Sequence, residues 1–507
     1  MSPVRGAIVG LLSVGCGLAF GQLIAGLSGA DSAPHLVVGN TMIDLTPEPV
    51  KAWAIRQFGD SDKAVLLAGM AVVIALLSAC AGVIARFAPL VGSIIIATFG
   101  GLGVLAAVLR PDGDLVRTLP AITAVLVSLG CFAVLIRFAR QEAGRAAAQT
   151  TAPNPARRRF LVTAATMAGL AGLAVAGGGL LMNRTGIEAA RQRISGLLRA
   201  NPPTPPGADF ASDGTPTFIT PNRDFYRVDT LLSVPRINPA EWRLRIHGMV
   251  DSELDVDFAE LTARRSVSRT ITMTCVSNEV GGKYVSTAVF TGVPLRELLA
   301  EAGVRSGAEQ VFSTSWDGYT AGTPVEVLTD PDRDALLAYG MNGVALPAEH
   351  GFPVRMVTPG LYGYLSATKW VVDLELTTFD RQTYWEARGW ATDAPIKVQS
   401  RIDRPAAFER LAPGPVTIAG VAWAQPNGIE RVEVRVDGGT WRSAELSTEV
   451  NTHTWRMWRL SVELGPGGHS IECRATDKTG QRQTSRRVPP TPNGATGWHS
   501  VSCSVSQ

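Results

Sequence analysis

The chain has 507 residues, which is long enough for two or three domains. Its formal net charge is only +3, so the charge balance does not favour nucleic acid or an acidic polymer as a partner. None of its six cysteines forms a Cys-x-x-Cys pair, which excludes a zinc ribbon, a thioredoxin-like site and c-type haem attachment. The long apolar runs are confined to residues 1–182.

Five of these runs, at residues 6–27, 64–85, 87–109, 118–139 and 160–182, each offer roughly the 20 apolar residues that cross a bilayer as a helix. We therefore predict a five-helix transmembrane anchor over residues 1–182. The runs contain no histidine, so two axial imidazoles for a membrane b-haem are missing. Between the first two runs, one short amphipathic helix is expected after Pro47, with Val50, Trp53 and Phe58 on its apolar face.

The basic residues predict the orientation of this anchor. With a cytoplasmic N-terminus, eight arginines face the cytoplasm and five basic residues face outward, which places residue 183 onward outside. The eight arginines are 5, 86, 137, 140, 145, 157, 158 and 159. Residues 157–161, Arg-Arg-Arg-Phe-Leu before an Ala/Gly-rich run, resemble a twin-arginine export signal, although a plain positive-inside cluster explains them too. The fifth run is followed by no evident cleavage site, which predicts a retained anchor.

The remaining chain has the pattern of an ordinary globular protein. Residues 183–215 are predicted to be a linker, with a polar helical stretch before the stiff segment 201–206. Residues 216–410 mix strand alternation, as at 242–247 and 270–275, with helical periodicity at 294–303, which indicates a mixed α+β catalytic domain. Residues 411–507 alternate like strands, for example at 432–436 and 458–464, and predict an immunoglobulin-like β-sandwich.

Three cysteines outside the apolar runs carry hypotheses. Cys275 ends a predicted strand and precedes a glycine-containing polar loop, so its thiolate can serve as a nucleophile or a soft metal ligand. A buried core cysteine is the alternative. Cys473 and Cys503 lie on the apolar faces of two sandwich strands, and they can form a disulfide or remain two separate thiols.

Three motifs give the sequence a family resemblance: Thr274-Cys-Val-Ser-Asn278, His350-Gly-Phe-Pro-Val-Arg355 followed by Pro359-Gly360, and Lys369-Trp370. With these motifs, roughly residues 215–505 resemble the sulfite oxidase family of molybdopterin-dependent oxidoreductases. The whole layout resembles polytopic, membrane-anchored actinobacterial members with an internal twin-arginine signal.

The resemblance implies a molybdenum–molybdopterin cofactor and a site for it. Cys275 would ligate molybdenum beside the two dithiolene sulfurs of the pterin, and basic side chains would hold its phosphate. The residues implied to contact the cofactor are Phe225, Tyr226, Arg227, Asp229, Cys275, Asn278, Asp317, His350, Arg355, Ala367, Thr368 and Lys369.

The catalytic residues implied are Cys275, Arg227, Tyr319 and Trp390, and here the sequence departs from sulfite oxidases. Arg227 takes the place of the arginine that contacts substrate and favours an oxyanion. Asp229, however, replaces a family histidine, and Val280 stands where an arginine is expected. Trp390 replaces the active-site tyrosine; an indole can only donate a hydrogen bond, and Tyr319 could substitute for the missing phenol in part.

The sequence thus predicts an extracytoplasmic, membrane-anchored enzyme that moves an oxygen atom and two electrons between molybdenum and a small substrate. The alternatives are a true sulfite oxidase, a sulfoxide-type reductase, and a metal-free scaffold or adhesion protein of the same fold. Without a haem motif or an iron–sulfur cysteine set, electrons must pass to or from a separate cytochrome or a quinone. A homodimer through the sandwich is implied by the resemblance alone.

Overall fold

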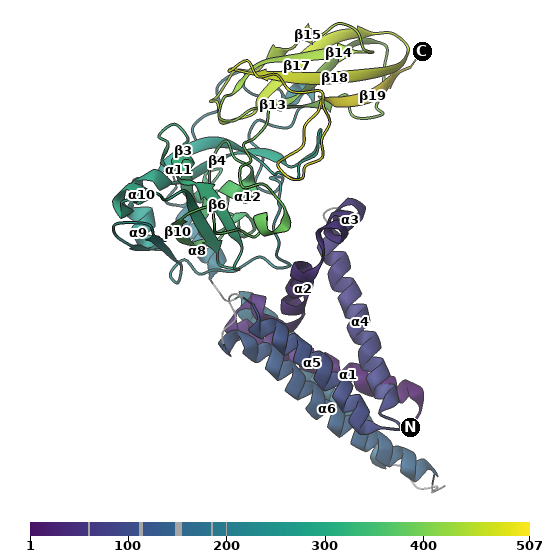
Figure 1. The fold of residues 1–507 in the computed structure, drawn as a ribbon. Helices are drawn as coiled ribbons and strands as arrows, with labels where there is room; N and C mark the ends of the chain where they lie inside the picture. Colours follow the sequence, from purple (N-terminus) through teal and green to yellow (C-terminus); the bar gives the residue numbers. More distant parts are fainter. Residues whose placement is uncertain (59–60, 111–114, 148–154, 184–185, 199, 507) are drawn as a thin grey trace. The chain divides into compact units, whose positions relative to one another are not determined.

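The computed structural model describes residues 1–506 apart from 59–60, 111–114, 148–154, 184–185 and 199 (Figure 1). The chain forms two compact units. Met1–Ile187 together with Asp229–Arg236 make a helical unit, and Glu188–Val228 together with Ile237–Gln507 make a second unit of mixed structure. The short segment Asp229–Arg236 therefore belongs to the helical unit, although the residues on either side of it in the sequence do not.

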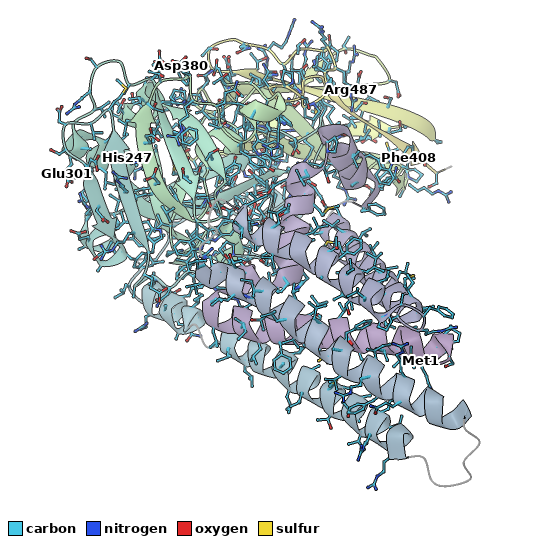
Figure 2. All side chains as sticks on the ribbon, turned by 60° about the horizontal axis from the view of Figure 1, so that its bottom comes forward. Met1, His247, Glu301, Asp380, Phe408 and Arg487 are labelled. Atoms are coloured by element: carbon cyan, nitrogen blue, oxygen red, sulfur yellow. The ribbon has the colours of Figure 1, made fainter. Side chains whose placement is uncertain are left out.

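The helical unit confirms the five predicted apolar helices. Among the described residues, the five helices long and apolar enough to cross a membrane are α1, α4, α5, α6 and α7. Side chains project from these helices along their length (Figure 2). Large apolar side chains among them are uncovered, such as Leu90 and Leu173, which are 72% and 70% exposed. The helices of this unit are α1 (Pro3–Ser28), α2 (Pro34–Leu45), α3 (Glu48–Phe58), α4 (Asp62–Ile84), α5 (Pro89–Val108), α6 (Leu115–Ala147) and α7 (Pro155–Asn183).

Glycines allow the first helix to pack closely within this unit. α1 lies against α4, α6 and α7. A Cβ added to Gly82 of α4 would lie 2.0 Å from the carbonyl oxygen of Gly6 in α1, so only glycine fits at this contact. Small residues at helix contacts let backbones approach, which is the way apolar helices associate in lipid.

The connection between the first two apolar helices differs from the prediction. It contains two helices, α2 and α3, where the sequence indicated one. α3 is the expected amphipathic segment, and its Trp53 and Phe58 rings meet edge to face at 5.8 Å. α2 was missed because Gly39 and Asn40, two poor helix formers, occupy its middle.

The α/β domain of the second unit consists of two sheets with short helices. One sheet has the order β2-β1-β10-β5-β6, with β1 and β10 parallel; the other has the order β3-β4-β7-β8, with β9 paired to β7. The strands are β1 (Arg243–Gly248), β2 (Leu254–Asp257), β3 (Val267–Thr274), β4 (Val285–Pro294), β5 (Gln310–Ser315), β6 (Thr320–Pro324), β7 (Leu336–Met341), β8 (Val344–Ala345), β9 (Arg355–Val357) and β10 (Val371–Thr377). The helices are α9 (Phe258–Ala263), α10 (Leu295–Ala302), α11 (Val325–Thr329) and α12 (Gly363–Ser366), with the 3-10 turns η4 (Ala348–His350) and η5 (Glu386–Arg388).

The C-terminal domain is a sandwich of two β-sheets around one apolar core. The sheets have the orders β11-β13-β17-β16 and β12-β19-β18-β14-β15, and residues of both, such as Ile418, Trp458 and Ile471, are fully buried together. The strands are β11 (Gln399–Arg404), β12 (Arg410–Leu411), β13 (Gly414–Trp423), β14 (Ile429–Val436), β15 (Arg442–Ser443), β16 (Glu445–Leu446), β17 (Arg456–Leu464), β18 (Gly467–Asp477) and β19 (His499–Val505). Because β11 pairs with β13, the sandwich begins before residue 411, where the sequence pattern placed its start.

The two sandwich cysteines are separate thiols. Cys473 pairs with His499 in the β18–β19 ladder, whereas Cys503 pairs with His469. The positions of the two cysteines along these neighbouring strands therefore differ by four residues, which separates their Cα atoms by about 13 Å. A disulfide needs Cα atoms within about 7 Å. The ladder excludes the bridge that the sequence left open.

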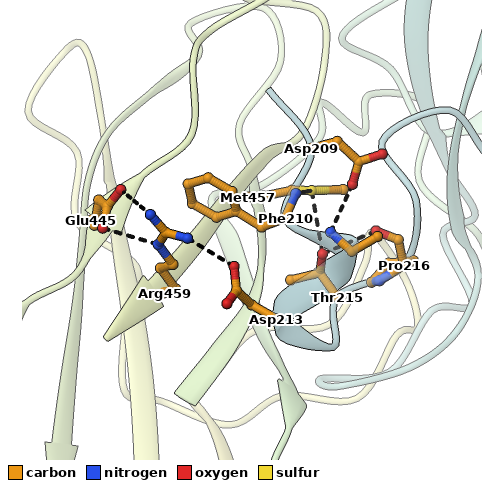
Figure 3. A network of polar contacts seen from close by, with 9 residues as sticks. Asp209, Phe210, Asp213, Thr215, Pro216, Glu445, Met457 and Arg459 are labelled. Carbon is orange, nitrogen blue, oxygen red and sulfur yellow. Dashed lines mark hydrogen bonds and ion pairs between the residues drawn. The ribbon is translucent and has the colours of Figure 1, made fainter. Parts of the chain in front are cut away.

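The predicted linker 183–215 is attached to both domains of the second unit instead of running free. Its helix α8 (Ile187–Ser195) is the expected polar helix, and Ser195 Oγ accepts the backbone N–H of Ala345 at 2.8 Å. Further on, around the 3-10 turn η3 (Ala211–Asp213), the chain lies on the sandwich (Figure 3). The backbone N–H of Phe210 meets Met457 Sδ at 3.1 Å, and Arg459 joins Glu445 of β16 to Asp213.

Candidate active site

Cys275 lies where the sequence predicted, at the first position after strand β3. The loop from residue 275 to 284 joins β3 to β4, whose ladder ends at the pair Thr274 and Val285. The Cys275 N–H donates to the Tyr284 carbonyl at 3.0 Å, and the Tyr284 N–H donates to Asn278 Oδ1 at 2.8 Å. These bonds close the base of the loop and hold the sulfur just beyond the sheet.

The thiol is only half-buried, and its surroundings include groups that raise its pKa and groups that lower it. Burial raises the pKa of Cys275, while the Ser277 hydroxyl and the positive charge of Lys369 lower it. The Ser277 Oγ lies 2.9 Å from the sulfur. A protonated thiol is thus the resting form, and a metal cation that replaces the proton would find a soft donor already supported by a hydroxyl.

The deepest cation of the site is Arg355, at the start of β9. Its guanidinium is buried and donates to the carbonyls of Met356, His350 and Ala367 at 3.3, 3.1 and 3.3 Å. Within the described part of the chain, no carboxylate lies within ion-pair distance of it. Burial lowers its pKa to about 10, so it remains charged at neutral pH. A buried cation whose partners are carbonyl dipoles and the face of the Phe290 ring, and not a carboxylate, favours an anionic ligand.

His350 and Lys369 surround this cation. His350 Nε2 lies 3.2 Å from the carbonyl oxygen of Asn222, so this nitrogen carries the hydrogen. Burial and the charges of Arg355 and Lys369 lower its pKa to about 3, which leaves the ring neutral. Lys369 Nζ donates to the Glu349 carbonyl at 3.3 Å. The predicted residues His350, Arg355 and Lys369 therefore do come together.

The segment after α12 completes this group through its backbone. Ala367 contributes its carbonyl to Arg355, and the Thr368 carbonyl accepts the N–H of Met356 at 2.8 Å. The Thr368 hydroxyl, however, is bonded to Ser313 Oγ at 2.7 Å and is fully buried. Thr368 thus positions the segment, and its side chain has a structural partner.

The segment Phe225–Arg227 lies against the same group. The Phe225 ring meets the His350 ring edge to face at 5.4 Å, and the Tyr226 N–H donates to Ser286 Oγ at 3.2 Å. Arg227 is exposed, and its charge contributes to the lowered pKa of His350. Of the residues implied at this segment, Phe225, Tyr226 and Arg227 therefore share the neighbourhood of the basic group.

Tyr319 and Asp317 occupy the turn between β5 and β6. The Tyr319 hydroxyl donates to the Tyr364 carbonyl at 3.0 Å. Burial, the Asp317 carboxylate and the Cys275 thiolate all raise the pKa of Tyr319, so the phenol stays protonated. Asp317 itself accepts a hydrogen bond from Ser315. Tyr319 therefore lies close enough to Cys275 for the charge of a thiolate there to act on the phenol.

Three further expected residues, Asp229, Asn278 and Trp390, have neighbours other than the basic group around Arg355. Asp229 belongs to the helical unit, where its carboxylate accepts Lys63 Nζ at 2.6 Å. Asn278 uses its side-chain oxygen within its own loop. Trp390 packs on Tyr364, with ring centroids 5.8 Å apart, and its buried Nε1–H has no acceptor in the described structure. The ion pair accounts for Asp229 without a cofactor, and we do not propose Asp229 as a cofactor contact.

Sequence reasoning missed two groups near the sulfur. Tyr362 is buried, and burial together with the Cys275 thiolate raises its pKa to about 12. Ser277, inside the quoted cysteine motif, supports the sulfur directly. The sequence could have indicated Ser277, because a turn after Cys275 can bring the hydroxyl of a serine two residues later back to the sulfur. Nothing in the sequence placed Tyr362, because its proximity arises from the tertiary fold.

The residues present fit a molybdenum–pterin cofactor. In the described ranges, no three His, Cys, Asp or Glu side chains gather as a metal site, so a metal bound at Cys275 would need ligands that the chain does not supply. A dithiolene would supply them. The buried Arg355, with Lys369 beside it, would provide positive charge for the phosphate of the pterin.

Comparison with known proteins agrees with this fit. Residues 231–385 match the family described as oxidoreductase molybdopterin binding domain, and residues 391–502 match the Mo-co oxidoreductase dimerisation domain. Sulfite oxidase of Gallus gallus is 30% identical over 322 residues, which are 54% of this chain and 69% of the relative. A nitrate reductase [NADH] of Solanum lycopersicum is 28% identical and matches 54% of this chain, but only 37% of the relative.

A solved structure shows the same fold. The sulfane dehydrogenase SoxCD from Paracoccus pantotrophus matches 62% of this chain and 88% of its own, with a TM-score of 0.51 and 23% sequence identity. The two domain matches lie almost entirely in the second unit; only residues 231–236 of the first match belong to the helical unit. By these matches and the coverage of the Gallus gallus enzyme, the chain belongs to the sulfite oxidase family of molybdopterin-binding oxidoreductases.

Proposed function

We propose that this chain is a membrane-anchored oxidoreductase that transfers an oxygen atom and two electrons between its molybdenum cofactor and a small oxyanion outside the cytoplasm. The observation that carries the proposal is the group around Cys275. A supported thiol lies within electrostatic reach of Lys369, and the buried Arg355 lacks a carboxylate partner in the described structure.

When bound, the cofactor supplies the two-electron oxygen-atom-transfer chemistry. Cys275 holds the metal as a thiolate, and Arg355, Lys369 and the neutral His350 hold the phosphate and ring edges of the pterin. The phenols of Tyr319 and Tyr362 stay protonated, because burial raises both pKa values. The Tyr319 hydroxyl already donates to the Tyr364 carbonyl, so Tyr362 is the phenol that can donate a hydrogen bond to an oxygen atom.

An oxyanion substrate follows from the charges near the site. Arg227 is exposed and lies near His350, so it can meet an anion from solvent. The indole N–H of Trp390, which has no acceptor in the described structure, offers one more donor. Sulfite and nitrate are thus the oxyanion candidates, despite Val280 and Trp390. A neutral sulfoxide, reduced by the same kind of chemistry, is the alternative substrate.

The helical unit supports the location. Its five apolar helices are long enough to cross a bilayer, and the predicted arginine distribution places the N-terminus in the cytoplasm. The twin-arginine motif lies in the first turns of α7 and would export the second unit in its folded state. Electrons would pass to a separate cytochrome or a quinone, and two copies would pair through the sandwich. Protease protection of tagged termini in spheroplasts tests the orientation.

The test of function is chemical analysis of the full-length chain, purified in detergent from a host that makes molybdopterin. We expect about one molybdenum and one pterin per chain in the wild type, and loss of the metal in Cys275→Ser. Sulfite oxidation with an artificial acceptor, and nitrate or sulfoxide reduction with an artificial donor, would then identify the substrate. Well-folded wild type without metal or pterin would contradict the proposal and favour a scaffold.

A further inference from the structure

The tip of the Cys275 loop is held by the other domain. Arg401, on strand β11 of the sandwich, donates from Nη1 to the carbonyl of Gly282 at 2.9 Å. Its Nε donates to Asp403 Oδ1 at 2.8 Å, and the two side chains are only 11% and 16% exposed. The arginine is thus locked by its carboxylate partner in the position from which it reaches the loop.

A second side chain of the sandwich, His499, lies beside Gly281, the residue before Gly282 in the loop. His499 Nδ1 accepts the backbone N–H of Ile402 at 2.9 Å, so the hydrogen of the neutral ring lies on Nε2. This nitrogen would lie 2.2 Å from a Cβ added to Gly281, which leaves no room for a side chain. Gly281 also has φ +81°, a backbone conformation that glycine adopts without strain.

The held residues are continuous with the base of the loop. Gly282 lies two residues before Tyr284, whose carbonyl accepts the Cys275 N–H and whose N–H bonds to Asn278. Movement at Gly281 and Gly282 would therefore shift Tyr284, and with it the backbone bond that sets the position of the sulfur. Arg401 ties this part of the loop to strand β11 of the sandwich.

We propose that Arg401 and His499 are positioning residues by which the sandwich domain holds the metal-ligand loop, so that Cys275 Sγ is presented in one place. This inference rests on the proposed function for the identity of the bound group. The hold of Arg401 and His499 on the loop, called the brace below, can be tested without that function. Release of the loop should make the Cys275 thiol reactive, since the open loop exposes a sulfur that the closed loop half-buries.

The experiment measures alkylation of Cys275 by iodoacetamide in the full-length, cofactor-free protein, with the modified peptide quantified by mass spectrometry. The variant Arg401→Gln/Asp403→Asn removes the brace without leaving a buried charge. We expect alkylation roughly tenfold faster than in the wild type, the effect of one lost charge-assisted hydrogen bond on local opening. Arg456→Gln/Glu449→Gln is the matched control, because Arg456 also joins a carboxylate to a backbone carbonyl in the sandwich.

A substitution in the loop itself tests the same contact without changing the Arg401–Asp403 ion pair. Gly281→Ala should accelerate alkylation as well, because its methyl group meets His499. Gly480→Ala, at φ +86° with open space around it, imposes similar backbone strain without that contact and should not. Wild-type rates in both brace variants, or equal acceleration in the controls, would overturn the inference. Metal-free wild-type protein from a competent host would refute the proposed function alone, since alkylation is measured without cofactor.

Discussion

Replacing Arg355 with methionine tests whether Arg355 binds an anion or stabilises the fold. Methionine fills much of the same volume with an unbranched apolar chain but has no charge and no donor. In the cofactor-free protein, the arginine contributes two opposing effects. Its pKa falls from 12.5 to about 10, which corresponds to roughly 3 kcal/mol of unfavourable burial.

The hydrogen bonds of Arg355 offset that cost. It donates to three backbone carbonyls, and each such bond contributes about 1 kcal/mol net, or about 3 kcal/mol together. The two effects nearly cancel, so Arg355→Met should leave the melting temperature of the cofactor-free protein within a few degrees of the wild type. With the cofactor, the loss of one charge-assisted bond to the phosphate should weaken binding roughly ten- to a hundredfold.

The assay compares pterin fluorescence and molybdenum content of full-length Arg355→Met with the wild type, and thermal unfolding of both proteins made without cofactor. Arg264→Met, in a surface ion pair with Glu301, is the control and should retain the cofactor. Wild-type cofactor content in Arg355→Met would show that Arg355 holds no anion. A fall in melting temperature of about 9 °C, as roughly 3 kcal/mol would cause in a domain of this size, would show that the arginine is structural.

Three further predictions concern other parts of the chain. Lys63→Gln should release the segment Asp229–Arg236 and speed its cleavage by trypsin, whereas Arg117→Gln, in another ion pair of the helical unit, should not. His350 is neutral in the fold with a pKa of about 3, so below pH 6.5 the unfolded chain gains a proton that the folded chain lacks. The free energy of unfolding should therefore fall by up to about 1.4 kcal/mol per pH unit between pH 6.5 and 3, and less steeply in His350→Gln. Chemical denaturation at several pH values measures this, and equal pH slopes in the wild type and the variant would contradict it. Trp390→Phe removes a donor without a partner, so the melting temperature should hold while KM for the oxyanion rises; an unchanged KM would exclude Trp390 from substrate binding.

Much of the architecture was readable from local patterns. The apolar runs predicted the five long helices, and period-two alternation predicted β1, β14 and β17, because both signals depend only on neighbouring residues. The domain boundary was placed too late for a related reason. β11 is a short strand whose partner, β13, follows it in sequence, and its mixed polar and apolar residues give no clear alternation.

The candidate site was predicted where a motif carries it and missed where the tertiary fold does. Motifs in the sequence name Cys275, His350 and Arg355, and the structure brings His350 and Arg355 into contact. Asp229 was interpreted as a change in the pocket, but it pairs with Lys63, which lies 166 positions away in the sequence. Arg401 could not have been identified either, since its contact with Gly282 spans 119 positions and two domains.

The central claim is that Cys275 binds molybdenum in this chain. X-ray absorption at the molybdenum edge of the purified full-length protein measures the sulfur ligands directly, and Cys275→Ser is the comparison. We expect the variant to lose one sulfur ligand, or to lose the metal altogether, while Ser277→Ala keeps the wild-type sulfur count. An unchanged sulfur shell around molybdenum in Cys275→Ser would contradict the claim.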